Sequence, residues 1–194
     1  MKIVAFNGSP RAGGNTAQLL DLVLRTVKAE DGGADIETEL VELGPKPLSG
    51  CIACYKCHER KNRRCAVESD PLNDYIDRML AADAVLLGSP TYFADLTTNM
   101  KSLIDRAGMV ARANGYMFKR KVGASVATAS RRGAIHTYDS MNHFFLNAQM
   151  LVPGSNNWNL GFGLAPGEVN EDSEALETME TLGRNLLWLL RRVA

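Results

Sequence analysis

Short apolar runs separated by longer amphipathic stretches are the feature that most constrains the fold of this chain. Residues 2–6, 84–88 and 122–127 are apolar almost throughout. Runs of this kind are typical of parallel strands that are buried on both faces. Residues 36–43 alternate apolar with acidic or polar side chains, which favours an outer strand, and 158–162 is a weaker fifth candidate.

Apolar residues at helical spacing predict a helix after each of these strands. The expected helices begin at Asn15 or Thr16 as the N-cap, after Ser69-Asp70-Pro71, and at Thr97 or Thr98, and two more cover about 134–150 and 171–193. Five alternations of strand and helix predict an α/β protein. Its expected core is a doubly wound five-stranded parallel sheet with helices on both faces.

Length and charge limit the classes of function. A chain of 194 residues fits one domain over 1–194, with no interdomain linker. The formal net charge is zero, so we expect neither nucleic acid nor a membrane as partner. No apolar run approaches the roughly 18 residues of a membrane span. The first residues enter a strand pattern without the apolar region of a signal peptide, so we expect a cytoplasmic protein.

Three loops follow the carboxyl ends of predicted strands, at 9–16, 89–95 and 128–133. Ligands of open α/β sheets bind at this edge. In the first loop, glycines allow close backbone approach and the next helix presents unpaired N–H groups to an anion. Its potential ligands for a phosphate are Ser9, Arg11, Gly13, Gly14, Asn15 and Thr16. The Walker A and G-x-G-x-x-G patterns are absent, and a plain glycine-rich turn stays the alternative.

The second loop offers a surface for a flat ring. Pro90 restricts the backbone, and Tyr92 and Phe93 supply aromatic faces. The alternative is a turn whose aromatic residues are merely buried.

Together, these loops resemble a known family. Gly8-Ser9-Pro10-Arg11 followed by Gly14-Asn15-Thr16 is similar to the phosphate loop of NAD(P)H-dependent FMN reductases and their flavodoxin-like relatives. Ser89-Pro90-Thr91-Tyr92-Phe93, with Met100-Lys101 and Asp105-Arg106, resembles their second flavin loop and helix. The resemblance spans about 1–130 and implies a flavodoxin-like, FMN-dependent oxidoreductase.

The resemblance also implies which residues bind FMN. Its phosphate would be held by Ser9, Arg11, Gly14, Asn15 and Thr16. Its ring would run beside Pro90, Thr91, Tyr92 and Phe93, and be closed on the other side by Thr128, Ser130 and Gly133. No side chain is expected to act as a catalytic acid or base, because the flavin carries the chemistry.

All four cysteines lie in a segment of about 44–68 that shows no periodicity. Cys51, Cys54 and Cys57 form a C-x2-C-x2-C run, and Cys65 follows after seven residues. A disulfide framework would scatter its cysteines, so this grouping indicates metal or redox chemistry. Three thiolates at this spacing can surround an iron–sulfur cluster. Free thiols or zinc remain alternatives, although structural zinc sites usually use two separated ligand pairs.

The complete pattern resembles the iron–sulfur flavoproteins, which combine this FMN fold with a four-cysteine [4Fe–4S] motif. The resemblance implies electron transfer between an external donor, the cluster and FMN. It also implies a homodimer or tetramer, and the expected electron donor is a ferredoxin-like protein or NAD(P)H. Ala66 follows Cys65 where the ferredoxin run has proline, so the sequence alone does not establish that a cluster is bound. The alternatives are a cluster-free NAD(P)H-dependent FMN or quinone reductase, a non-enzymatic FMN electron carrier, and a zinc-stabilised interaction domain.

Several other polar and aromatic residues receive a structural interpretation. The basic side chains of 60–64 would offset cluster charge and attract an acidic carrier, and His58 is expected to be solvated. Asp105 and Arg106 are expected to form a local ion pair or a dimer contact. Core or dimer packing is expected for His136, Tyr138, His143, Phe144 and Phe145.

Overall fold

A computed structural model describes residues 1–32 and 36–193. Within these residues, five strands form one parallel sheet in the order β2-β1-β3-β4-β5. The strands are β1 Lys2–Asn7, β2 Glu37–Glu42, β3 Ala84–Pro90, β4 Val122–Ala129 and β5 Leu160–Phe162. This order confirms the predicted doubly wound sheet, whose switch point lies between β1 and β3.

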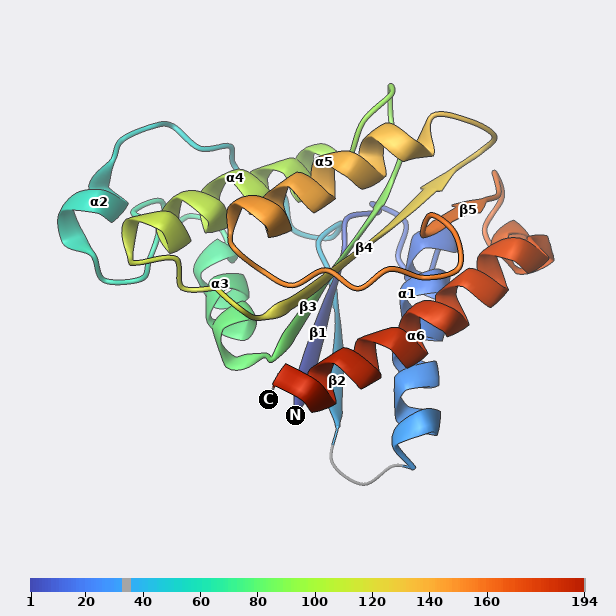
Figure 1. The fold of residues 1–194 in the computed structure, drawn as a ribbon. Coiled ribbons are helices and arrows are strands. Elements are labelled where there is room, and N and C mark those ends of the chain that lie inside the picture. Colours follow the sequence, from blue (N-terminus) through green and yellow to red (C-terminus); the bar gives the residue numbers. More distant parts are fainter. Residues whose placement is uncertain (33–35, 194) are drawn as a thin grey trace.

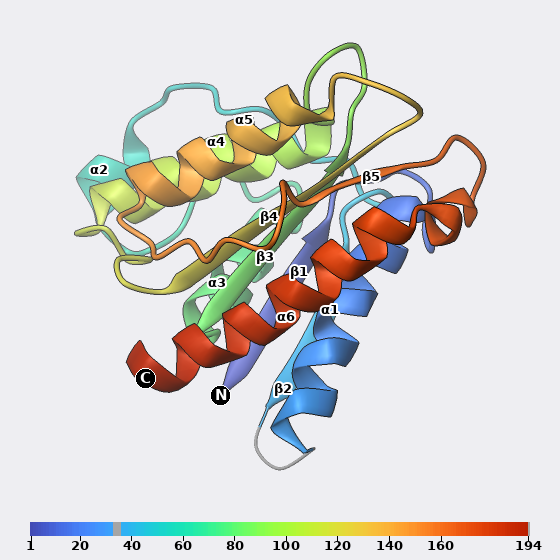
Figure 2. The same ribbon diagram turned by 45° about the vertical axis from the view of Figure 1, so that its right-hand side comes forward.

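Helices cover both faces of the sheet, as Figures 1 and 2 show from two sides. One face carries α1 (Asn15–Asp31) and α6 (Ser173–Val193), and the other carries α3 (Leu72–Ala81), α4 (Thr98–Ala113) and α5 (Ala134–Asn147). A short helix, α2 (Lys56–Arg60), stands outside these layers beside α4. None of the helices described here is both long and apolar enough to cross a bilayer.

The apolar runs form strands because each of their faces meets a helical layer. Phe6 and Leu87 are fully buried on the face covered by α3, α4 and α5. Ala5 and Leu86, one residue earlier in each strand, are fully buried under α1 and α6. Side chains that alternate between two apolar layers require a run without polar positions, which is what these strands show.

The ends of several elements differ from the prediction. Both β3 and β4 are longer than expected, so Ser89, Pro90 and Thr128 belong to strands and not to the loops after them. Trp158 lies outside β5, which pairs with β4 only over 160–162. A 3-10 turn over Glu168–Glu171 precedes α6, which begins at Ser173, and α5 ends at Asn147.

The N-terminus of α4 agrees with the prediction, whereas that of α1 does not. Thr97 caps α4 by accepting a hydrogen bond from the Met100 N–H at 3.4 Å. Asp70 precedes α3 and accepts a hydrogen bond from the Leu72 N–H at 3.3 Å. The prediction for α1 was wrong, because its N-cap is Gly14. Glycine is accepted at an N-cap, and it leaves the side chains of the first turn free for other partners.

The contact between β4 and α5 predicts the effect of one substitution. A Cβ added at Gly123 would lie 2.7 Å from Cγ of the buried Phe145 ring. We expect Gly123→Ala to lower the free energy of unfolding by about 1–3 kcal/mol, because a packed ring has nowhere to move. Chemical denaturation measures this change. Gly154→Ala is the control, since nothing lies within 4 Å of its added Cβ, and an equal loss in both variants would contradict the packing argument.

Candidate functional site

A polar pocket lies at the carboxyl ends of β1, β3 and β4, where ligands of doubly wound sheets bind. It has a volume of about 130 Å³. Its lining contains most of the residues predicted for FMN, namely Ser9, Arg11, Gly14, Asn15, Thr16, Pro90, Thr91, Tyr92, Thr128 and Ser130. Loops that are separate in the sequence therefore meet in one site.

Two hydrogen bonds at the switch point hold the loop after β1 against β3 and the start of α4. The Gly8 N–H donates to Gly88 O at 2.7 Å, and the Thr97 hydroxyl donates to Gly8 O at 2.8 Å. A Cβ at Gly8 would lie 3.0 Å from the Thr97 hydroxyl oxygen, so a larger residue would push the loops apart. In the lining of the pocket, the hydroxyl oxygens of Thr16 and Thr128 lie 2.7 Å apart and connect α1 to β4.

The pocket has a further wall that the sequence did not predict, formed by the segment after β5. Gly163, Leu164 and Pro166 line it. Asn15 holds this segment: its amide group donates to Gly163 O and Ala165 O, both at 3.0 Å, and accepts from the Gly167 N–H at 2.7 Å. The cluster of turn formers at 163–167, directly after a predicted strand, is the signal that could have revealed this wall.

Two of the predicted flavin residues lie outside the pocket lining. Phe93 sits in a tight turn in which Tyr92 and Asp95 exchange backbone hydrogen bonds, and its side chain is fully exposed. Phe93 and Ala94 both have positive φ, at 47° and 74°, a conformation that costs about 1–2 kcal/mol per residue. Gly133 has φ 85° and caps α5 beside Thr91. The turn therefore presents Phe93 to solvent at the edge of the pocket.

The four cysteines line one small, largely apolar cavity between their loop and the second half of α4. Cys51 and Cys54 are exposed, whereas Cys57 and Cys65 are half-buried against the core. Burial raises the pKa of the Cys57 thiol, and backbone N–H groups partly oppose this. Among residues 1–32 and 36–193, no three His, Cys, Asp or Glu side chains converge on a single metal ion. Four soft thiol donors around one cavity fit the chemistry of a thiolate-held cluster.

The backbone around the cysteines turns sharply. Ala53 and Tyr55, which flank Cys54, have φ of 50° and 53°, and Lys61 and Arg63 have φ of 46° and 62°. Residues other than glycine in the left-handed backbone conformation are strained, and such residues cluster at functional sites. The expectation that His58 is solvated was wrong: its ring lies against Tyr55, and its Nε2 is buried with no hydrogen-bond partner among the residues that the structure describes.

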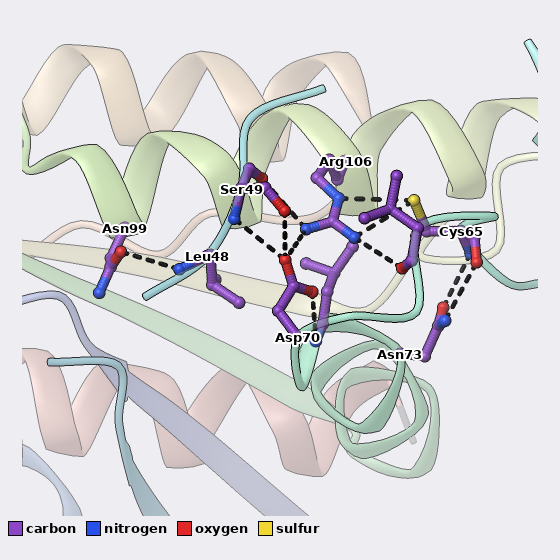
Figure 3. A network of polar contacts seen from close by, with 9 residues as sticks. Leu48, Ser49, Cys65, Asp70, Asn73, Asn99 and Arg106 are labelled. Atoms are coloured by element: carbon purple, nitrogen blue, oxygen red, sulfur yellow. Dashed lines mark hydrogen bonds and ion pairs between the residues drawn. The ribbon is translucent and has the colours of Figure 1, made fainter. Parts of the chain in front are cut away.

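A buried arginine on α4 connects both ends of the cysteine loop (Figure 3). Arg106 is 1% exposed. Its Nη1 donates to Asp70 Oδ2 at 2.6 Å and to Ser49 O at 3.1 Å, and its Nη2 donates to Val67 O at 2.9 Å. Its Nε and Nη2 both lie 3.4 Å from Cys65 Sγ. The expected pair of Arg106 with Asp105 was therefore wrong, and Asp105 pairs instead with Lys101 one turn earlier.

Asparagines secure the remaining backbone of this loop (Figure 3). Asn73 accepts from the Cys65 N–H at 2.8 Å and donates to Cys65 O at 3.0 Å. Asn99 accepts from the Leu48 N–H at 3.1 Å and donates to Leu43 O at 2.8 Å. Cys65 is consequently fixed through its backbone as well as its sulfur.

The ion pair has a clear electrostatic consequence. Burial alone would raise the pKa of Asp70, but hydrogen bonds from Arg106 and Ser49 lower it to about 2. Burial alone would lower the pKa of Arg106, but Asp70 and Cys65 outweigh it and raise the pKa. Both groups are therefore charged at neutral pH.

The aromatic residues of α5 are buried, whereas its histidines and the basic residues of the cysteine loop are exposed. Tyr138, Phe144 and Phe145 are buried in the core, as expected. His136 and His143 are exposed, and His136 lies 3.6 Å from Asp95. The basic residues of 60–64 are exposed, and Arg64 pairs with Asp77 at 3.0 Å.

Comparison with known proteins decides the family. The family model described as NADPH-dependent FMN reductase matches residues 1–165. The chain belongs to this family. It is therefore a flavin-dependent oxidoreductase, and FMN is the cofactor that the family implies. Both the resemblance and the reaction class predicted from the sequence are confirmed.

Relatives agree with this assignment, and a solved structure shares the fold. An iron-sulfur flavoprotein of Methanocaldococcus jannaschii is 35% identical, over 100% of this chain and 99% of its own. An iron-sulfur flavoprotein of Methanosarcina thermophila is 28% identical over 100% and 97%. The crystal structure of a flavodoxin, WrbA-like protein from Agrobacterium tumefaciens superposes with a TM-score of 0.66 at 13% identity, covering 100% and 98%. The last comparison confirms the flavodoxin-like fold.

The buried ion pair predicts how stability depends on pH. Because the pKa of Asp70 falls from 3.8 to about 2 on folding, its contribution is complete above pH 4 and is lost as pH falls through 2. We expect Asp70→Asn to lower the free energy of unfolding by about 3 kcal/mol at pH 7, since it leaves Arg106 buried without a counter-ion. The difference from wild type should shrink towards pH 2.

Urea unfolding of metal-free protein across this pH range measures the effect. Asp77→Asn is the control, because it breaks the exposed pair with Arg64 and should change stability by less than about 1 kcal/mol. A deficit in Asp70→Asn that stays constant down to pH 2 would contradict the assignment.

Proposed function

We propose that this protein is an iron–sulfur flavoprotein that transfers electrons between an external donor, a [4Fe–4S] cluster and FMN. The observation that carries the proposal is the gathering of all four cysteines around one cavity on a chain that also has a polar pocket at the switch point. The iron–sulfur flavoproteins among its relatives support the same conclusion.

The phosphate of FMN would bind at the N-terminus of α1. The first N–H groups of a helix have no partner within the helix, and they attract an anion together with the helix dipole. The Ser9 hydroxyl lies beside this end, where it accepts from the Arg11 N–H at 3.1 Å. The Arg11 side chain lies at the outer rim and donates to Leu164 O at 3.3 Å. Asn15 would act indirectly, because its amide is already bound to the segment at 163–167.

The ring of FMN would lie against the ends of β3 and β4. Thr91 is held there by hydrogen bonds from its N–H to Thr128 O at 2.7 Å and from the Thr137 hydroxyl at 2.9 Å. The adjoining turn carries Tyr92 and Phe93, whose aromatic faces suit a flat ring. FMN supplies one- and two-electron transfer when bound, and these residues position it and restrict the access of water.

A cluster would be held by Cys51, Cys54, Cys57 and Cys65. The donor set fits, because thiolates are the usual ligands of iron–sulfur clusters. A [4Fe–4S] cluster supplies one-electron transfer when bound. Arg106 lies about 12 Å along α4 from its first residue Thr98, at a rise of roughly 1.5 Å per residue. The cysteines and the flavin pocket are thus associated with different parts of the same helix.

The proposal extends to the electron donor and to the oligomeric state. A ferredoxin-like protein would be attracted by the exposed basic residues Arg60 and Arg63, and NAD(P)H is the donor that the family description suggests. A homo-oligomer is expected from the resemblance, and sedimentation of the purified protein would measure it.

An absorption spectrum with iron and sulfide analysis, on protein purified without oxygen, tests the function. We expect flavin bands with broad brown absorbance and about four irons and four sulfides per chain. Flavin bands without iron would instead indicate a cluster-free FMN or quinone reductase. Absence of flavin after addition of FMN would contradict the flavin pocket.

The role of Asn15 gives a separate prediction for FMN binding. We expect Asn15→Ala to weaken FMN binding by about 10- to 100-fold, because three hydrogen bonds to the pocket wall, each worth about 1 kcal/mol, are lost. Fluorescence titration of the FMN-free protein measures the affinity. Asn170→Ala is the control, since it removes a hydrogen bond of 2.6 Å to Gln18 outside the pocket. Equal affinity of the two variants would rule out this role.

A further inference from the structure

The guanidinium of Arg106 is oriented towards one of the four thiols. Arginine has five N–H donors in a planar fork. Here one edge of the fork, Nε and Nη2, faces Cys65 Sγ at 3.4 Å from both nitrogens. The other nitrogen, Nη1, faces Asp70 at 2.6 Å. A fork that contacts an acceptor through two N–H groups is the geometry with which arginine recognises negative charge.

The position of this charge differs from that of the other basic residues of the loop. Arg106 lines the cysteine cavity and is 1% exposed. Arg63 lies only two residues from Cys65 in sequence but is exposed to solvent. Because water and salt screen exposed charges, a buried guanidinium acts on the cavity far more strongly than an exposed one.

Asp70 and the loop backbone hold Arg106 in place. Ser49 O precedes the cysteines and Val67 O follows them, and both accept hydrogen bonds from the guanidinium. Asp70 contributes a negative charge on the side of the guanidinium away from the sulfur. The electrostatic potential at the cavity is therefore the positive contribution of Arg106, partly cancelled by the negative contribution of Asp70.

We propose that Arg106 is a positioning residue that fixes the Cys65 ligand and raises the reduction potential of the cluster, and that Asp70 limits this effect. The inference rests on the proposed function. Hydrogen bonds and positive charge at a cluster's sulfurs withdraw electron density and favour the reduced state. Cys65 would thereby differ electronically from the other three ligands.

The test is the midpoint potential of the cluster in the holoprotein, followed by EPR during a redox titration. We expect Arg106→Gln to lower the potential and Arg106→Lys, which keeps the charge but not the fork, to lower it less. Asp70→Asn should raise it. Arg63→Gln is the matched control and should shift the potential less than Arg106→Gln does. Resonance Raman spectra should show a changed Fe–S(Cys) stretch in the Arg106 variants alone.

Opposite shifts for Arg106→Gln and Asp70→Asn would support the inference, because a purely structural role would not give them. If Arg106→Gln loses its iron, Arg106→Lys and Asp70→Asn still decide the sign. If the Arg106 and Asp70 variants bind about four irons per chain and keep the wild-type midpoint potential, the inference is overturned and the proposed function stays intact. A wild-type protein without iron would overturn the proposed function and this inference together.

Discussion

The parallel pairing of the strands is the constraint on which the rest of the structure depends. In a parallel sheet all strands end at the same edge, so the loops that follow them must meet there. The loops after β1, β3 and β4 consequently form one pocket. Thr16 and Pro90 both line it, although more than 70 residues separate them in the sequence. The segment after β5 joins them for the same reason, and the Asn15 side chain holds it through direct hydrogen bonds.

Burial of the sheet on both faces determines what else the chain can do. Every apolar side chain of the central strands packs into a helical layer, so the polar groups of the two sites come from the loops and from the ends and outer parts of the strands and helices. The cysteine loop leaves the carboxyl edge after β2 and reaches along α4, where a second and chemically different site forms. Because α4 contributes its cap to the first site and Arg106 to the second, this helix fixes the position of both.

The cysteine loop has little regular structure of its own, and buried polar contacts replace it. Several residues between the cysteines adopt left-handed conformations without being glycine. The unfavourable backbone energy is offset by the contacts of Arg106, Asp70, Asn73 and Asn99 with the loop. A buried charge without its partner would be costly, so Arg106 and Asp70 are buried as a pair. The cavity among the cysteines is thus held by a network that lies outside the cysteine motif.

The sequence by itself determined the order of strands and helices, the position of the glycine-rich loop before α1 and the set of cysteines. These features are local, because strand periodicity, glycine positions and cysteine spacing are properties of neighbouring residues. Only the tertiary structure decided that Asn15 binds the wall at 163–167, that Phe93 faces solvent, and that Arg106 pairs with Asp70 and Cys65 and not with Asp105. The contacts of Asn15 and Arg106 join residues far apart in the chain, whose geometry is set by how the helices pack on the sheet. The exposure of Phe93 follows from the left-handed turn at 93 and 94, which no sequence pattern indicated.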